Sequence, residues 1–99
     1  MDKEKLQLLK KKHGDIYTLT VKTDDKEYVA YLRRPTRDEY FAYFSFVSSN
    51  NILKGFDVLL RTCMIEGDSE IVDDDKVYLT ALNQIAGLVD LYEGELKKN

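Results

Sequence analysis

The stretch that decides the fold is residues 28–39, Tyr-Val-Ala-Tyr-Leu-Arg-Arg-Pro-Thr-Arg-Asp-Glu, because it passes from a strand-like run directly into a helix start. Residues 28–33 are rich in aromatic and β-branched side chains that alternate between two faces, which is typical of a strand. Pro35, the only proline in the chain, interrupts this run. Thr36 and Glu39 then have the spacing of a capping box, so the sequence predicts a helix beginning directly after the proline.

The residues before this stretch predict a helix and a second strand. Ile16–Lys22 alternates apolar residues with threonines, and the polar residues 23–26 separate it from the strand at 28–33. We therefore expect an antiparallel β-hairpin. Leucines among lysines predict a short helix at the N-terminus, which ends at Gly14.

The residues after Pro35 predict helices only. The first helix runs to Val47 and closes at residues 48–51, and a second covers residues 52–65 with Gly67 as its stop signal. The last helix begins near Asp73, Asp74 and Asp75, and its apolar stripe consists of Leu82, Ile85, Val89, Tyr92 and Leu96. A two-stranded hairpin is not stable alone, so helices must cover one of its faces. We predict an α+β fold in which an N-terminal helix and an antiparallel β-hairpin are followed by three helices packed on the hairpin.

Composition indicates one folded domain over residues 1–99, since 43% of the residues are hydrophobic and 33% are charged. The formal net charge of −3 argues against general affinity for polyanions. Cys63 is the only cysteine, which excludes a disulfide-stapled secreted scaffold. The sequence also lacks a signal peptide and an apolar run of membrane-spanning length, so we expect a cytoplasmic protein without membrane contact.

Side chains that could carry chemistry are few. His13 has no partner at acid–base or metal-ligand spacing, and Cys63 lies on the apolar side of its predicted helix without a neighbouring base. The acidic block at residues 66–75 does not match a calcium-binding loop. Its aspartates at 73–75 are interpreted as a solvated helix cap, and weak cation binding there stays open. We therefore expect no enzyme activity, no cofactor and no metal site.

A basic and aromatic cluster offers one binding hypothesis. Arginines and tyrosines alternate around the proline, a pattern found in nucleic-acid-binding proteins; the residues are Arg33, Arg34, Arg37, Tyr28, Tyr31 and Tyr40. Asp38 and Glu39 flank the cluster, and a solvated strand end with inward-facing aromatics explains the same residues. Nucleic acid is therefore an unlikely partner, and a small cytoplasmic nucleic-acid-binding or regulatory interaction domain is the alternative function.

The aromatic helix after Pro35 offers a second hypothesis. Its apolar side chains occupy most of the circumference, so the helix is either centrally buried or partly exposed at an interface. Aromatic side chains on an accessible face are common anchors of protein–protein contacts. We predict a partner-binding surface formed by Tyr40, Phe41, Tyr43, Phe44 and Phe46.

Two stretches carry a family resemblance. Residues 31–39, Tyr-Leu-Arg-Arg-Pro-Thr-Arg-Asp-Glu, and residues 59–68, Leu-Leu-Arg-Thr-Cys-Met-Ile-Glu-Gly-Asp, are similar to patterns in the small tail assembly chaperones of long-tailed bacteriophages and prophages. The order of elements resembles that family from about residue 3 to residue 97. The positions that match the pattern are Arg34, Pro35, Cys63 and Gly67, and they are structural markers only.

The resemblance implies a non-enzymatic role in virion morphogenesis. Such chaperones bind the long, helical and apolar tape measure protein in the cytoplasm of the host bacterial cell while tail tube subunits assemble around it. The implied partners are thus the tape measure protein and possibly the tail tube protein, and a homo-oligomer is also possible.

Overall fold

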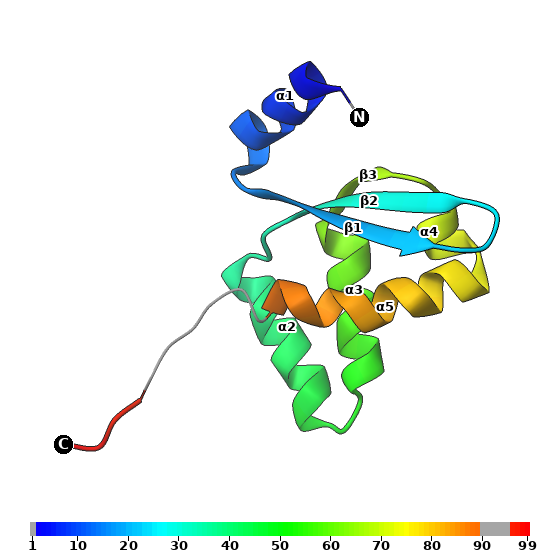
Figure 1. Cartoon of the computed structure of the whole chain (residues 1–99). Coiled ribbons are helices and arrows are strands. Elements are labelled where there is room, and N and C mark those ends of the chain that lie inside the picture. The colour runs from blue at the N-terminus through cyan, green and yellow to red at the C-terminus, as the bar shows by residue number, and fades with distance from the viewer. Residues whose placement is uncertain (1, 90–95) are drawn as a thin grey trace.

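The computed structural model describes residues 2–89 and 96–99, and in this part the chain has the predicted α+β fold (Figure 1). An N-terminal helix and an antiparallel hairpin come first and helices follow, which confirms the predicted layout. In chain order the elements are α1 (Lys3–His13), β1 (Ile16–Lys22), β2 (Glu27–Arg33), α2 (Arg37–Ser48), α3 (Ile52–Cys63), β3 (Met64–Gly67), α4 (Glu70–Asp73) and α5 (Asp75–Val89).

The hairpin has a regular register. Ile16 pairs with Arg33 at one end, and Lys22 pairs with Glu27 at the other. β2 therefore begins at Glu27, one residue before the predicted start at Tyr28. The turn is closed by the Thr23 N–H, which donates to Lys26 O at 2.8 Å. Alternate residues of each strand face the helices and are buried, as period-two patterning requires.

A third strand replaces the predicted end of the second helix. The prediction of one helix over residues 52–65 is wrong after Cys63, because β3 starts at Met64 and pairs antiparallel with β2. Gly67 is therefore a strand residue opposite Ala30 and does not terminate a helix. Its φ is 143°, and a Cβ atom would lie 2.5 Å from Val29 O, so a side chain cannot fit between these two strands.

The last helical region is split at Asp74. The single turn of α4 precedes it, and α5 begins at Asp75 near the predicted start. Asp74 Oδ1 accepts hydrogen bonds from the N–H groups of Lys76 at 3.0 Å and Val77 at 3.1 Å, which caps the new helix. Leu96 does not extend the predicted stripe, since it is exposed and has no regular structure. Tyr92 lies outside the described residues.

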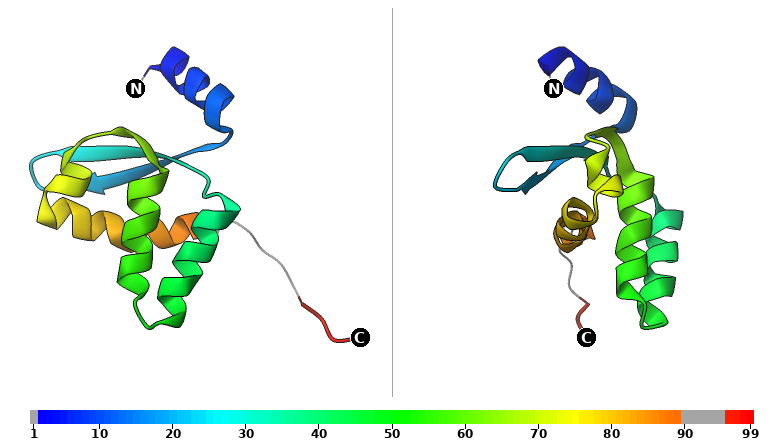
Figure 2. Two further views of the ribbon diagram at one scale, coloured as in Figure 1. Left: turned by 180° about the vertical axis from the view of Figure 1, so that it is seen from behind. Right: turned by 90° about the vertical axis from the view of Figure 1, so that its right-hand side faces the viewer.

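The helices are distributed unequally over the two faces of the sheet. α3 and α5 lie against one face, and α1 projects from the other side (Figures 1 and 2). The core between the sheet and the helices contains Leu19, Val21, Ala30, Leu32, Leu59, Leu60, Cys63, Ile71, Val77, Ala81, Leu82, Ile85 and Leu88. By contrast, α1 buries no residue, and an exposed ion pair from Lys5 Nζ to Glu66 Oε1 at 3.0 Å links it to β3. The core therefore positions α2, α3 and α5, whereas α1 is peripheral.

Candidate protein-binding surface

The start of α2 is fixed by the capping box read from the sequence. Thr36 Oγ1 accepts from the Glu39 N–H at 3.3 Å, and Glu39 Oε1 accepts in return from the Thr36 N–H at 2.8 Å. Pro35 is buried beside this cap. These contacts set where the helix begins and hence which side of it faces α3.

The aromatic residues of α2 divide between its two sides. Tyr43 is 7% exposed and belongs to the core, whereas Tyr40 and Phe46 are half-buried. Phe41 is 62% exposed and Phe44 is 55% exposed. The predicted aromatic set is therefore not uniformly exposed: Phe41 and Phe44 face solvent, and Tyr43 packs inward.

A glycine of α3 explains why Tyr43 can pack inward. A Cβ atom at Gly55 would lie 3.0 Å from Tyr43 Cδ1 and 3.4 Å from Phe46 Cβ, so the missing side chain lets the two helices approach closely. At the next residue of α3, the ring of Phe56 is stacked with that of Tyr43, and their centroids are 5.7 Å apart. The close contact of α2 with α3 leaves the opposite side of α2 uncovered by α3.

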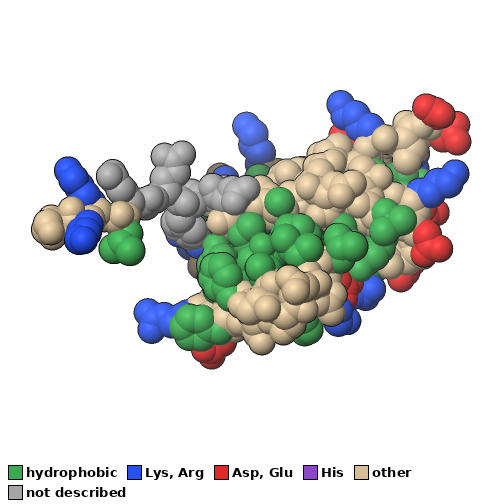
Figure 3. All heavy atoms as spheres, turned by 90° about the horizontal axis from the view of Figure 1, so that it is seen from below, with side chains coloured by type: hydrophobic (Ala, Val, Ile, Leu, Met, Phe, Trp, Pro, Cys, Tyr) green, Lys and Arg blue, Asp and Glu red, His purple; other side chains and the backbone are tan. Residues whose placement is uncertain are grey.

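Further apolar side chains are exposed on the neighbouring helices. Viewed from the end opposite the sheet, hydrophobic side chains gather in a band between α5 and the α2–α3 pair, and charged side chains lie mainly at the periphery (Figure 3). The large hydrophobic residues of these three helices that are exposed are Phe41, Phe44, Ile52, Leu53 and Leu79. We call these five residues the exposed apolar set. Exposed apolar side chains on neighbouring helices often mark an interaction site.

A polar cluster holds α3 against α5. The Tyr78 hydroxyl of α5 and Arg61 Nε, at 2.8 Å, both donate to Oδ1 of Asp57 on α3. Burial opposes ionisation of Asp57, but these hydrogen bonds outweigh it, and the pKa of the carboxyl group lies below its usual value. Leu53 lies one turn before Asp57, on the side of α3 that faces α5. The cluster thus fixes the two helices that carry Leu53 and Leu79.

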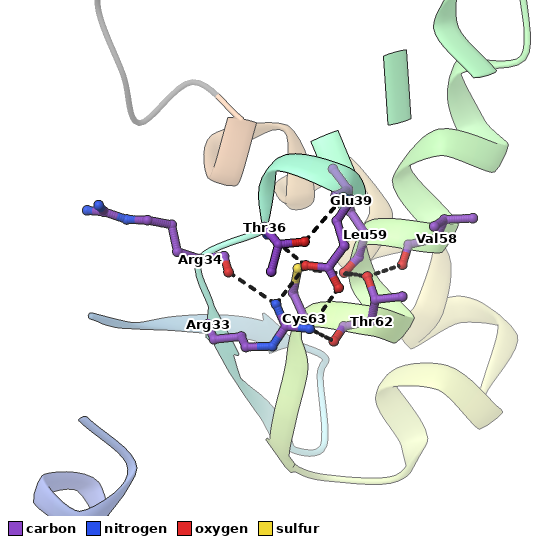
Figure 4. Close-up of polar contacts among 8 residues, drawn as sticks. All are labelled: Arg33, Arg34, Thr36, Glu39, Val58, Leu59, Thr62 and Cys63. Atoms are coloured by element: carbon purple, nitrogen blue, oxygen red, sulfur yellow. Dashed lines mark hydrogen bonds and ion pairs between the residues drawn. The ribbon is translucent and has the colours of Figure 1, made fainter. Parts of the chain in front are cut away.

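The arginines near Pro35 are used within the fold (Figure 4). Arg33 binds Glu39 through two hydrogen bonds, with Nη1–Oε1 at 2.7 Å and Nη2–Oε2 at 2.8 Å, and Nη2 also donates to Thr62 O at 2.8 Å. The hydrogen bonds from Arg33 lower the pKa of Glu39 from its ordinary value of 4.5 to about 2. We call Arg33, Thr36, Glu39 and Thr62 the hinge, because they join β2, α2 and α3.

The other two arginines lie outside the hinge. In Figure 4 the Arg34 side chain points away from it, and Nη2 of Arg34 lies 2.8 Å from Asp15 Oδ2 and 3.1 Å from the Tyr17 hydroxyl. Arg37 is exposed in the first turn of α2. Carboxylates therefore neutralise Arg33 and Arg34, which does not favour the nucleic-acid alternative.

The remaining candidate groups lie in ordinary structural positions. Cys63 is completely buried, and burial raises the pKa of its thiol, so the reactive thiolate is disfavoured. His13 is half-buried at the end of α1. In residues 2–89 and 96–99, no three His, Cys, Asp or Glu side chains are grouped so that they could hold a metal ion. No helix of this described part combines the length and apolar character needed to cross a membrane.

Two features of the surface were not predicted from the sequence. β3 places Glu66 where Lys5 reaches it, and Asp68, directly after β3, accepts through Oδ2 from the Val29 N–H of β2 at 2.8 Å. The local signal for this strand is weak, because Ile65 is its only β-branched residue. With this geometry in place, comparison with known proteins gives no match to any family model, curated protein or solved structure.

Proposed function

We propose that this chain is a non-enzymatic assembly chaperone that binds an apolar helical partner, namely the tape measure protein of a long-tailed bacteriophage or prophage, in the cytoplasm of the host cell. The sequence resemblance at residues 31–39 and 59–68 supports the choice of partner. The exposed apolar set supports the mode of binding, since an amphipathic helix buries its apolar face against such surfaces. A tail tube protein is a further possible partner.

The observation that carries this proposal is the exposure of Phe41 and Phe44 on a well-anchored helix. Large aromatic side chains are frequent hot spots of protein interfaces. The hinge and the close contact at Gly55 hold α2 in place before any partner arrives. A preorganised surface loses little conformational freedom on binding, so these side chains can contribute directly to affinity.

The test is capture of the tape measure protein encoded in the same phage or prophage. Co-expression with the tagged wild-type chain should keep that protein soluble and retain it on affinity resin. Phe41→Ser and Phe44→Ser, made separately, should each weaken capture about tenfold, as expected for loss of one interfacial aromatic anchor.

The matched control is Leu8→Ser, because Leu8 is 66% exposed but lies on α1, away from the proposed surface. This variant should capture the partner as well as the wild-type chain does. The proposal fails if the wild-type chain retains no tape measure protein. It also fails if folded Phe41→Ser and Phe44→Ser variants capture that protein with unchanged affinity.

A further inference from the structure

β1 is an edge strand with one unpaired side. The sheet order is β1-β2-β3, so within the described residues β1 pairs only with β2. The hydrogen bond from Thr23 to Lys26 fixes the alternation of the antiparallel ladder: odd-numbered residues of β1 bond to β2, and even-numbered ones direct their backbone groups outward. The N–H and C=O groups of Thr18 therefore point away from the sheet at the middle of the free edge.

A side-chain contact confirms this orientation. Gln84 Nε2 of α5 donates to Thr20 O at 2.9 Å from the outer side of β1. Among the residues that the structure describes, it is the only hydrogen bond that a side chain makes to the backbone of β1. Of the outward-pointing backbone groups, Thr20 O thus has a partner, whereas those of Ile16 and Thr18 have none among the described residues.

The open edge lacks the usual protection against pairing. Residues 16–21, Ile-Tyr-Thr-Leu-Thr-Val, contain no charged residue, proline or glycine, although a third of the whole chain is charged. The pairing of β1 with β2 is also free of bulges. Natural proteins normally place charges, prolines or bulges on exposed edges, and uncharged β-prone segments without them pair readily. This composition indicates an edge that is covered in the functional state.

A small apolar cavity lies directly beneath this edge. Its volume is about 160 Å³, and Tyr17, Leu19, Gly87 and Leu88 are among the residues that line it. A Cβ atom at Gly87 would meet no atom within 4 Å, so packing among the described residues does not require glycine there.

We propose that the β1 edges of two copies of this chain pair antiparallel about a two-fold axis that passes beside Thr18, joining the two sheets into one. In this register Thr18 faces Thr18 of the second copy, and Thr20 faces its Ile16. Thr20 O then accepts from the Ile16 N–H of the second copy as well as from Gln84 Nε2, because a carbonyl oxygen has two lone pairs. Threonine pairs are favourable across strands, and only an antiparallel pairing of this kind makes one patch complementary to itself. Tyr17 of each copy is placed opposite Leu19 of the other, so apolar side chains meet at the mouths of both cavities.

The register also keeps charges apart. Lys22, the only charged residue of β1, lies beyond the paired segment and faces Gly14 of the second copy. A register centred on Lys22 would place the two lysines directly opposite each other, which is unfavourable. The interface uses neither Phe41 nor Phe44, so this inference is independent of the proposed chaperone function.

The first test is sedimentation velocity of the full chain from micromolar to millimolar concentration. The wild-type chain should form a dimer. Thr18→Pro removes the outward N–H at the centre of the interface without removing a bond to β2, and it should weaken the dimer about tenfold or more. Thr18→Ser keeps both backbone groups and should dimerise as the wild-type chain does. A wild-type chain that stays monomeric at every concentration overturns the proposal.

The second test reads the register directly and does not depend on how Thr18→Pro folds. Two Thr18→Cys chains place their cysteines opposite each other, so a short bis-maleimide should link them efficiently. Two Thr20→Cys chains place theirs about 13 Å apart along the strands and should link far less. The wild-type chain, whose Cys63 is buried, is the background control. Equal linking of the two variants contradicts the proposed pairing.

Discussion

Arg33, Thr36 and Glu39 of the hinge precede Phe41 and Phe44 closely in the sequence, yet the two groups differ in polarity and in burial. The hinge consists of charged and polar groups, and its ion pair is about four-fifths buried, with side-chain exposures of 22% for Arg33 and 20% for Glu39. Phe41 and Phe44 are apolar and are exposed over more than half of their surface. Charged residues near Pro35 thus stabilise the fold, whereas two aromatic residues of α2 stay exposed in the isolated chain.

The largest expected effect comes from breaking the hinge. Glu39→Ala removes the partner of a largely buried arginine and half of a capping box, so we expect the free energy of unfolding to fall by about 2–4 kcal/mol. Urea denaturation measures this loss. Arg37→Ala, an exposed change in the same helical turn, is the matched control and should alter stability by less than about 0.5 kcal/mol. If both variants lowered the free energy of unfolding equally, the hinge would contribute no more to stability than an exposed residue of α2 does.

The pH dependence of stability sharpens the same point. The pKa of Glu39 is lowered from 4.5 to about 2 in the folded chain, so its contribution is present above pH 4.5 and is lost as pH falls toward 2. The full contribution is about 3 kcal/mol. Urea denaturation should show the stability difference between the wild-type chain and Glu39→Gln shrinking over this interval. A difference that stays constant down to pH 2 would be inconsistent with the assigned ion pair.

The smallest expected effect on stability comes from the outer side of α2. Phe41→Ser should change the free energy of unfolding by no more than about 0.5 kcal/mol, because the side chain is exposed in the isolated chain. Thermal unfolding of the variant and the wild-type chain checks this. A loss of several kcal/mol would show that Phe41 serves the fold, and the contrast with Glu39 would disappear.

Local signals in the sequence predicted local structure correctly. Thr36 and Glu39 form the expected capping box, because both of its hydrogen bonds connect residues three apart. Gly14 ends α1 with a φ of 82°, a conformation that glycine adopts without strain. The alternation in Ile16–Lys22 also predicted its strand, since the pattern follows from burial of one face.

Features that depend on distant residues could not be predicted in the same way. The end of α3 is set by pairing of Met64–Gly67 with β2, and local periodicity does not report such long-range pairing. The aromatic residues of α2 look alike in the sequence, and only the position of α3, close to Tyr43 at Gly55, decides which of them are buried. Likewise, the sequence alone gives no sign that Arg33 is partly buried, because its partner Thr62 lies 29 residues away and reaches it only in the folded chain.

The bond between Arg33 and Thr62 O has a consequence for the order of folding. These residues are 29 positions apart, and α2 and α3 occupy the interval between them. Closing such a loop as a flexible chain costs about 3 kcal/mol of entropy or more. If the two helices pair first, they bring the ends of the loop together, and the third strand then joins the sheet with little further cost. We therefore expect α2 and α3 to pair before β3 completes the sheet.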